Sequence, residues 1–256
     1  MNVYVCVKQV PDTEATIVPK EGGTVDATNI KWIMCPYDEY AVEEAVSFKE
    51  NHPGCTLVAV SLGPDRAQET IRLALALGAD RGIHIVCDEY LDHILVAKAL
   101  ANVIKADGDY HLVFAGKQAT DDDGYQVPLR LARSLQAAVA TGVIAFEYED
   151  GVVNVTKDVG GGIQEKLELA APAVITAGKG LNEPRYPKLP NIMKAKRKEI
   201  KKLTLAEAGI TEIDNHQTII EFVTPPEKSA GRVLTGEKED TVPELVQALS
   251  KEAKVI

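Results

Sequence analysis

The stretch DYHLVFAGKQATDDDGYQVPLRLARSL, residues 109–135, decides the fold class of this chain. Its residues 112–115 form a short apolar run that is typical of a buried parallel strand, and Gly116 ends the run. Residues 127–135 show the spacing of an amphipathic helix. Pro128 fits this helix only in its first turn, where a residue without an N–H leaves no hydrogen bond unmade. The stretch therefore predicts a strand, a loop and a helix in succession.

The loop of this unit, residues 117–124, lies where a phosphate could bind but carries negative charges of its own. A helix that follows a glycine-ended strand presents unpaired N–H groups and a positive dipole end to its loop. Such an end suits the phosphate of a nucleotide. However, Asp121, Asp122 and Asp123 lie in the same loop and should repel a phosphate. The function depends on how this conflict is resolved.

The composition is that of a globular protein. The 256 residues suffice for one large domain or a domain with arms, and 45% are hydrophobic, 26% charged and 5% aromatic. The net charge of −10 argues against nucleic acid as a partner. No apolar run reaches the ~18 residues of a membrane-spanning helix, and no leader-like segment precedes the first predicted strand. The four cysteines form no CxxC pair, so we expect reduced thiols, no metal site and a cytoplasmic location.

Strands and helices are expected to alternate through the first half of the chain. The predicted strands are residues 3–7, 57–62, 83–86 and 112–115. Between them, helices are predicted from Pro36 to the His52-Pro53-Gly54 stop, from Asp65 to Gly78, and around residues 94–104. Asp38 is the expected N-cap of the first helix. This alternation predicts a parallel α/β sheet.

The pattern changes after Gly142. Residues 143–148 and 152–155 alternate on either side of Asp150-Gly151, which predicts a β-hairpin. Residues 163–169 alternate again, and 173–176 are expected to return to the same sheet. From residue 181 no clear periodicity is visible before a predicted helix at 241–253, whose Val246 and Leu249 are expected to face inward. Because so long an irregular segment is unusual inside a compact domain, we expect an arm that packs on a partner.

Three strand exits, residues 6–8, 62–64 and 115–126, are expected to converge. Ligands of open α/β sheets bind at the carboxyl ends of strands, where the strand order reverses. Neither GxGxxG nor GxxxxGK[ST] is present, so a nucleotide site and ordinary turn glycines at Gly63 and Gly116 both remain open. The five histidines lack metal or triad spacing and are expected to be surface or core residues. Ser61 lacks the elbow of a hydrolase.

Residues 182–202, NEPRYPKLPNIMKAKRKEIKK, form a second informative segment. Pro187 and Pro190 bracket Lys188-Leu189 and predict a stiff loop with an apolar tip, which suits an anchoring contact with another protein. Basic residues follow and flank this tip, namely Lys188, Lys194, Lys196, Arg197, Lys198, Lys201 and Lys202. A solvated charged face and a nucleic-acid patch are the alternatives, and the net charge disfavours the second.

Several long stretches resemble the β subunits of electron transfer flavoproteins. They are VCVKQVPDT from Val5, CPYDEYAVEEAV from Cys35, QETIRLALALGADRGIHI from Gln68, GKQATDDDGYQ from Gly116 and LNEPRYPKLPNIMKAK from Leu181, together with residues 155–162 and 172–176. The resemblance covers nearly the whole chain. It implies a Rossmann-like α/β fold of the adenine nucleotide alpha hydrolase-like type, with an antiparallel hairpin excursion and a C-terminal arm.

The resemblance also implies the division of the chain and its partners. Residues 1–180 would form the nucleotide-binding domain, including the hairpin at 143–169. Residues 181–202 would carry a partner recognition loop, and residues 203–256 an arm and helix on an FAD-carrying α subunit. The heterodimer would carry electrons from dehydrogenases, such as acyl-CoA dehydrogenases, to an ETF-quinone oxidoreductase or a similar acceptor. The chain itself would perform no bond-making chemistry.

A buried AMP is implied in this subunit. The positions that match its pocket are Cys6, Cys35, Pro36, Tyr37, Asp38, Leu62, Gly116, Lys117, Gln118, Ala119, Thr120, Asp121, Asp122, Asp123, Gly124, Tyr125, Gln126 and Val127. The position of the dehydrogenase anchor is matched by Leu189, with Pro190, Ile192 and Met193 beside it. Asp158 matches an acidic residue that contacts the mobile flavin domain, and Thr13 matches a position near the flavin.

Two types of β subunit compete. In electron-bifurcating relatives the β subunit holds a second FAD and oxidises NADH, and VCVKQVPDT with its Thr13 is similar to that type. The loop with Asp122 resembles the AMP type, because two charges ~4 Å apart at an effective dielectric constant near 20 cost about 4 kcal/mol and would oppose a diphosphate. Cys35 stands where the family usually has asparagine. AMP is therefore favoured, and the aspartates are expected to cap the helix and limit the ligand to one phosphate. A stand-alone nucleotide-binding stress-type module is the remote alternative.

Overall fold

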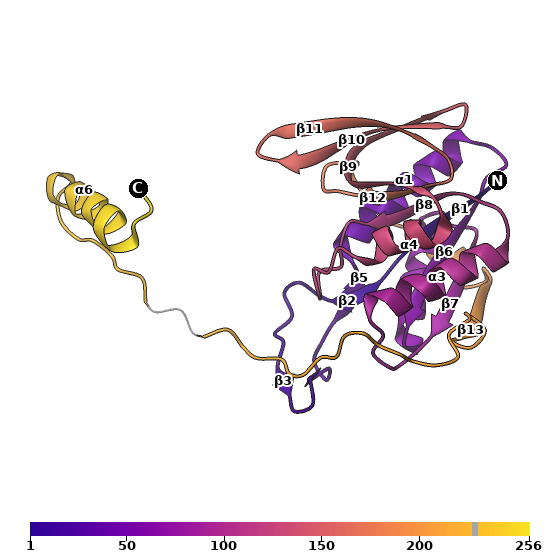
Figure 1. Ribbon diagram of the computed structural model, residues 1–256, viewed down its shortest axis with the longest axis horizontal. Coiled ribbons are helices and arrows are strands. Elements are labelled where there is room, and N and C mark those ends of the chain that lie inside the picture. The colour runs from indigo at the N-terminus through magenta and orange to yellow at the C-terminus, as the bar shows by residue number, and fades with distance from the viewer. Residues whose placement is uncertain (227–229) are drawn as a thin grey trace.

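The computed structural model describes residues 1–226 and 230–256, and its centre is a nine-stranded sheet (Figure 1). The strand order is β11-β10-β9-β12-β8-β1-β6-β7-β13. The bounds are β1 Asn2–Cys6, β6 Thr56–Gly63, β7 Arg81–Val86, β8 Tyr110–Gly116, β9 Ala138–Glu149, β10 Val152–Gly160, β11 Ile163–Ala170, β12 Ala173–Ala177 and β13 Ile200–Thr204. All neighbouring pairs are parallel except β9 with β10 and β10 with β11. The expected parallel α/β sheet with an antiparallel excursion is confirmed.

Helices cover both faces of the sheet, and each face has its own apolar cluster. Helices α1 (Pro36–Asn51) and α2 (Gln68–Leu77) pack on the face that holds Val3 and Val5. Helices α3 (His93–Asp107) and α4 (Val127–Leu135) pack on the face that holds Tyr4. Successive side chains of a strand point to opposite faces, so a fully apolar strand such as β1 serves both clusters. A short 3-10 turn, η1 (Asp65–Ala67), precedes α2.

Local sequence signals account for three of the helix ends. Asp92 caps α3, because its carboxylate accepts hydrogen bonds from Ile94 N and Leu95 N, both at 2.9 Å. Pro128 lies in the first turn of α4, as predicted. Gly78 ends α2 with a φ of 151°, which suits a residue without a Cβ.

The expected N-cap of α1 is wrong. The cap position is Cys35, and Asp38 lies inside the first turn with its side chain buried against the sheet. Pro36 starts the helix, since proline is well tolerated at the first helical position. The carboxylate of Asp38 is therefore free to bind elements other than its own helix.

The predicted hairpin is confirmed. Asp150 and Gly151 join β9 to β10 with φ angles of 50° and 88°, the left-handed pair that a tight hairpin turn requires. Strand β9 begins earlier than expected, at Ala138, and its first half pairs in parallel with β12. One long strand thus belongs to both the parallel sheet and the antiparallel excursion.

The region after residue 181 has more structure than its sequence indicated. It contains α5 (Leu189–Ala195) and β13, and β13 extends the sheet beside β7. Ala208 and Ile210 are buried in the core, so the body of the protein continues past residue 203, where the arm was expected to begin. Lysines at positions 201 and 202 of this edge strand face solvent. They interrupt its apolar residues, so the sequence shows no alternation that would predict a strand.

Helix α6 (Lys238–Gln247) and the π-helical turn η2 (Ala248–Ala253) lie apart from the sheet (Figure 1). They confirm the predicted C-terminal helix but not its inward face, because Val246 is 49% exposed and α6 has no buried residue. Residues 227–229 of the predicted arm lie outside the described residues. Two small antiparallel pairs complete the fold: β2 (Gln9–Pro11) with β5 (Trp32–Met34), and β3 (Pro19–Lys20) with β4 (Thr24–Val25).

Candidate functional site

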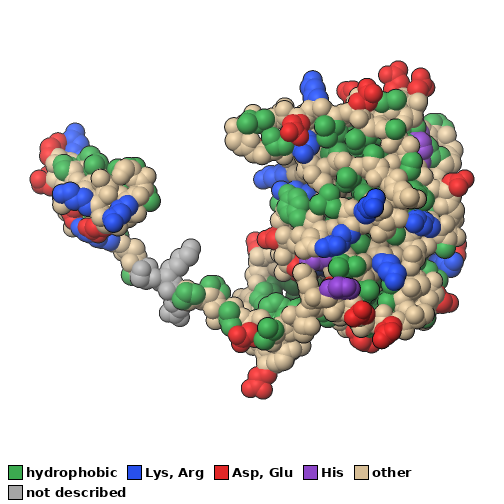
Figure 2. All heavy atoms as spheres, in the orientation of Figure 1, with side chains coloured by type: hydrophobic (Ala, Val, Ile, Leu, Met, Phe, Trp, Pro, Cys, Tyr) green, Lys and Arg blue, Asp and Glu red, His purple; other side chains and the backbone are tan. Residues whose placement is uncertain are grey.

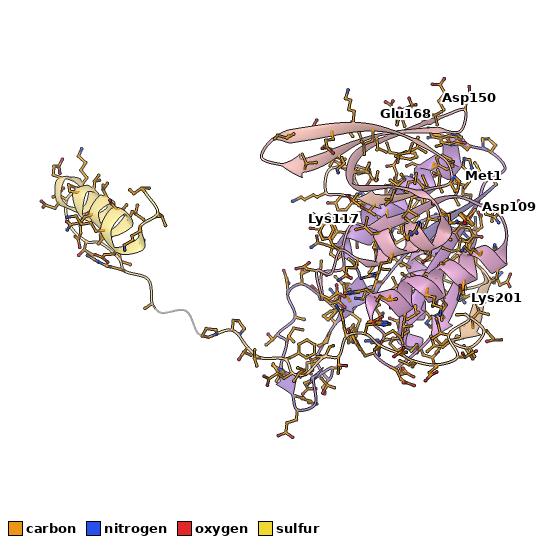
Figure 3. All side chains as sticks on the ribbon, in the orientation of Figure 1. Met1, Asp109, Lys117, Asp150, Glu168 and Lys201 are labelled. Carbon is orange, nitrogen blue, oxygen red and sulfur yellow. The ribbon has the colours of Figure 1, made fainter. Side chains whose placement is uncertain are left out.

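The three predicted strand exits meet at the point where the strand order reverses. After β1 the chain adds β6 and β7 on one side of it, then crosses to add β8 on the other side. Strands β6 and β8 are both parallel to β1, so their carboxyl ends lie together. Figure 3 shows this edge of the sheet: Lys117 follows the carboxyl end of β8 and lies far from the other edge. At that other edge Met1 precedes β1 and Asp109 precedes β8. The switch between β1 and β8 is the position where α/β sheets bind ligands.

Asp38 joins the two strand exits at this switch. Its Oδ2 accepts a hydrogen bond from Lys8 N at 2.7 Å, and its Oδ1 accepts one from Gly116 N at 2.9 Å. Burial raises the pKa of Asp38 to about 7, although the two N–H donors oppose the rise. One carboxylate on α1 therefore links the residues at the carboxyl ends of β1 and β8.

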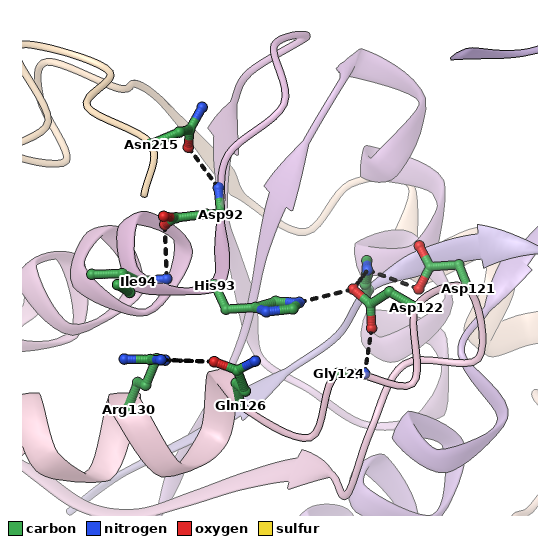
Figure 4. A network of polar contacts seen from close by, with 10 residues as sticks. Asp92, His93, Ile94, Asp121, Asp122, Gly124, Gln126, Arg130 and Asn215 are labelled. Carbon is green, nitrogen blue, oxygen red and sulfur yellow. Dashed lines mark hydrogen bonds and ion pairs between the residues drawn. The ribbon is translucent and has the colours of Figure 1, made fainter. Parts of the chain in front are cut away.

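The aspartate loop is held by one lysine and one histidine (Figure 4). Lys8 Nζ lies 2.8 Å from Asp121 Oδ1 and 3.2 Å from Asp122 Oδ2. The Nε2 of His93, at the start of α3, lies 3.1 Å from Asp122 Oδ2, and Gly124 N donates to Asp122 Oδ1 at 2.8 Å. The pKa of Asp122 is lowered: burial opposes the change, but Lys8 and the donors outweigh it. The carboxylate of Asp122 is thus held between Lys8 after β1, His93 at the start of α3 and the loop before α4.

The aspartates do not cap α4, which corrects the expected capping role. The cap position of α4 is Gln126, and among the described residues no side chain accepts a hydrogen bond from the free N–H groups of its first turn. Asp122 Oδ1 accepts a hydrogen bond from Gly124 N, which lies three residues before α4 begins at Val127. The amino end of α4 therefore keeps its positive dipole and its unpaired N–H groups for another acceptor.

Two cations lie beside this helix end. Lys117 Nζ lies 4.8 Å from the centre of the Tyr37 ring and 5.6 Å from that of Tyr125. Arg130 is held by Gln126, whose Oε1 accepts bonds of 3.1 and 2.7 Å from it. Within residues 1–226 and 230–256, neither cation has a carboxylate partner, so both remain able to balance an anion.

Buried polar atoms at the site also lack partners. Thr120 Oγ1 and His93 Nδ1 are buried and make no hydrogen bond within the described part of the chain. An unpaired buried polar atom is costly, so such atoms commonly bind a ligand or an ordered water. The residues at the switch therefore fit a small polar ligand such as a nucleotide.

The other predicted site residues differ in how deeply they are buried. Cys35 is fully buried, and its Sγ lies 3.4 Å from Gln118 O, which ties the start of α1 to the loop after β8. Cys6 and Leu62, at the ends of β1 and β6, are partly buried, as are Pro36 and Tyr37. Thr13 is exposed in a turn after β2 and makes no side-chain hydrogen bond to the strand exits among the described residues.

Sequence reasoning missed the role of His93. It lies 29 residues before Asp122, and only the packing of α3 beside α4 brings the two side chains together. Lys8 was part of a predicted strand exit, but no sequence signal paired it with Asp121 and Asp122. Two surface hollows, of about 790 and 310 Å³, lie elsewhere, at the carboxyl end of α1 around His52 and Tyr148.

The segment 182–202, for which a partner contact is predicted, exposes apolar side chains. Leu189 is the first residue of α5 and is 73% exposed, and Tyr186 before it is 93% exposed. Met193 and Ile192 on α5 are also exposed, and Pro190 lies in the first turn. Asp158 lies near the end of β10, beside the turn that leads to β11, and its Oδ1 accepts a hydrogen bond from Gly160 N at 2.8 Å.

Comparison with known proteins assigns the chain to a family. Residues 22–208 match the family model described as "Electron transfer flavoprotein domain". The chain belongs to the electron transfer flavoprotein family, as a β subunit. A Bacillus subtilis protein named electron transfer flavoprotein subunit beta is 39% identical over 261 residues, with both chains fully covered. Proteins of the same name from Bradyrhizobium diazoefficiens (40%, both chains fully covered) and Mus musculus (38%, 100% of this chain and 99% of the relative) are similar over equal lengths.

Membership of the electron transfer flavoprotein family confirms the resemblance drawn from the sequence. It assigns the chain a part in electron transfer, with an α subunit as partner and a flavin in the complex. The Arabidopsis thaliana relative, 38% identical, carries the word mitochondrial in its name, whereas the bacterial relatives do not. Among residues 1–226 and 230–256, no helix has the length and apolar character needed to cross a membrane.

Proposed function

We propose that this β subunit, joined to an FAD-carrying α subunit in the cytoplasm, shuttles electrons from dehydrogenases such as acyl-CoA dehydrogenases to a quinone oxidoreductase, and that it binds AMP. The observation that supports the AMP site best is Asp38, which bonds the ends of β1 and β8 at the switch point. Adenine nucleotides bind at such points in open α/β sheets. The chain would hold its nucleotide as part of the structure and not as a reactant.

One phosphate suits the charges of the site better than two. The free N–H groups at the start of α4, with Lys117 and Arg130 nearby, would bind a single phosphate. Beyond them Lys8 is shared by Asp121 and Asp122, so these three side chains carry a net negative charge before any ligand binds. A second phosphate that approached this cluster would be repelled.

Partner contacts would lie at three other places. Leu189, with Ile192 and Met193, would anchor the dehydrogenase, since it is an exposed apolar side chain on a short, proline-started helix. Asp158, near the turn between β10 and β11, would contact the flavin domain of the α subunit. Thr13 would lie near the flavin.

The C-terminal arm would bind the α subunit. Figure 2 shows hydrophobic side chains along the extended chain and on the separate helix, away from the body. The exposed apolar residues of this part are Ile219, Ile220, Phe222, Val223, Val233, Val242, Leu245, Val246, Val255 and Ile256. Such a set of exposed apolar side chains is typical of a surface that another chain covers.

A second candidate is an electron-bifurcating β subunit that holds a second FAD and oxidises NADH. VCVKQVPDT, with Thr13, favours it. The fixed Asp122 favours AMP instead, because its carboxylate is bound by Lys8, His93 and Gly124 N and is therefore not free to move aside.

The nucleotide content of the purified heterodimer tests the proposal. The chain is co-expressed with its α subunit, the complex is denatured, and the released nucleotides are quantified by chromatography. One FAD and one AMP per heterodimer are expected. Two FAD, with bleaching of the flavin by NADH, would replace the proposal with the bifurcating function. A stable monomer or homodimer that forms no complex with the α subunit would favour a stand-alone module.

A further inference from the structure

The segment that carries Leu189 is fastened to α1 at its beginning. Arg185 Nε lies 2.9 Å from Glu43 Oε2, and its Nη1 lies 2.7 Å from Glu50 Oε1. Glu43 and Glu50 are seven residues apart on α1, two helical turns, so one guanidinium reaches both. Asn182 adds bonds of 3.0 Å to Tyr40 O and 2.9 Å to Glu44 Oε2.

The same segment is fastened to α2 at its end. Arg72 Nη1 donates to two carbonyls after Leu189, Ala195 O at 2.7 Å and Lys198 O at 2.6 Å. Lys198 Nζ returns bonds of 3.0 Å to Leu75 O and 2.5 Å to Ala79 O. The carbonyl end of α5 is therefore closed by a cation from α2, and β13 starts at Ile200, after the four residues 196–199.

Between these two fastenings the backbone has little regular structure. Residues 182–188 form neither helix nor strand, and α5 has only seven residues. A helix that short is marginal on its own in water. The conformation of this segment therefore depends on the contacts at its two ends. At the first end, the Glu43 side chain that binds Arg185 is only 10% exposed.

We infer that Arg185, bound to Glu43 and Glu50, and Arg72, bound to the end of α5, are positioning residues that hold residues 186–194 in one conformation for docking. The inference rests on the proposed function of Leu189 as the dehydrogenase anchor. Neither arginine has to touch the dehydrogenase. They act because a loop that is already ordered loses less conformational entropy when it binds.

The test uses the complete αβ heterodimer and an acyl-CoA dehydrogenase that reduces the wild-type complex. Arg185→Gln and Arg72→Gln are compared with Lys20→Gln, which removes one positive charge and the surface ion pair with Asp26 outside this segment. Hydrogen exchange of residues 186–194 and the KM and kcat of flavin reduction are measured. Both arginine variants are expected to exchange faster in this segment and to raise the KM on the order of tenfold, with kcat and flavin content unchanged.

Conservative variants guard against loss of folding. Arg185→Lys and Arg72→Lys keep the charge but not the fork of N–H donors, so they are expected to fall between the wild type and the glutamine variants. Unchanged hydrogen exchange in residues 186–194 would overturn the inference, as would faster exchange with an unchanged KM. Leu189→Ala, run in the same assay, separates the two proposals: if it leaves the KM unchanged, the docking function itself is wrong.

Discussion

The carboxylate of Asp38 and the amide N–H of Gly116 are joined by a hydrogen bond of 2.9 Å between residues 78 positions apart in the chain. The second oxygen of the same carboxylate binds Lys8 N at 2.7 Å. Because each carboxylate oxygen binds one N–H group, Asp38 pairs the buried N–H of Gly116 and the partly buried N–H of Lys8. Helix α1 is thus bound to the carboxyl ends of both β1 and β8, which border the proposed nucleotide site.

Gly116→Ala is expected to destabilise the protein by about 1–3 kcal/mol, because it overpacks this junction. A Cβ at this position would collide with Asp38 Oδ1 and would lie 2.8 Å from Tyr37 Cβ. Urea denaturation measures the loss. Gly231→Ala is the matched control, since its Cβ meets no atom within 4 Å and should leave the stability unchanged. An equal, small effect of both substitutions would contradict the tight packing of Asp38 against β8.

Asp38→Asn is expected to change how stability depends on pH. Since burial raises the pKa of Asp38 to about 7, the folded chain keeps a proton between pH 4 and 7 that the unfolded chain has lost. The stability of the wild type relative to the variant should therefore fall as the pH rises through this range, by at most about 1.4 kcal/mol per pH unit, and level off above pH 7. Urea titrations of both proteins at several pH values give this difference. A difference that does not vary with pH would mean that Asp38 is ionised throughout.

Asp122→Gly is expected to loosen the selection of a single phosphate. The substitution removes the carboxylate that lies 3.2 Å from Lys8 and 3.1 Å from His93. The Lys8–Asp121 pair that remains is neutral, so the loop would no longer repel a diphosphate. The nucleotide released from the β subunit should then include ADP or FAD, while stability changes by no more than about 1 kcal/mol, because the ion pair is partly exposed. Asp123→Gly, which removes a charge from the same loop without touching Lys8, serves as the control. If only AMP is recovered from both variants, Asp122 does not select the ligand.

Leu189→Ala is expected to weaken transfer from the dehydrogenase on the order of tenfold while the flavin content stays normal. The side chain is exposed and makes no contribution to the core, so stability should not change. Stopped-flow reduction of the heterodimer by the dehydrogenase gives the rate. Tyr90→Ala, at a side chain that is 45% exposed on another part of the surface, is the control. Equal rates for the two variants would remove Leu189 as the anchor.

The parallel sheet, the hairpin and the exposed side chain of Leu189 could all be predicted from the amino-acid sequence. These features depend on local signals: continuous apolar runs for β1, β6 and β8, left-handed turn residues at Asp150-Gly151, and prolines on either side of Lys188-Leu189. It also indicated that the strand exits converge, because this follows from the topology of any such sheet.

The contacts inside the site could not be predicted, because they join residues that are far apart in the chain. Asp38 looked like a helix cap in the sequence, yet it binds two strands, because its rotation around α1 turns it toward the sheet. The aspartates of the loop looked like unpaired charges, yet Lys8 and His93, from distant parts of the chain, hold the carboxylates of Asp121 and Asp122 in place. The strand β13 carried too few apolar residues to be seen until its edge pairing with β7 was formed. Contacts between distant residues depend on how helices and strands pack, and no local spacing encodes that packing.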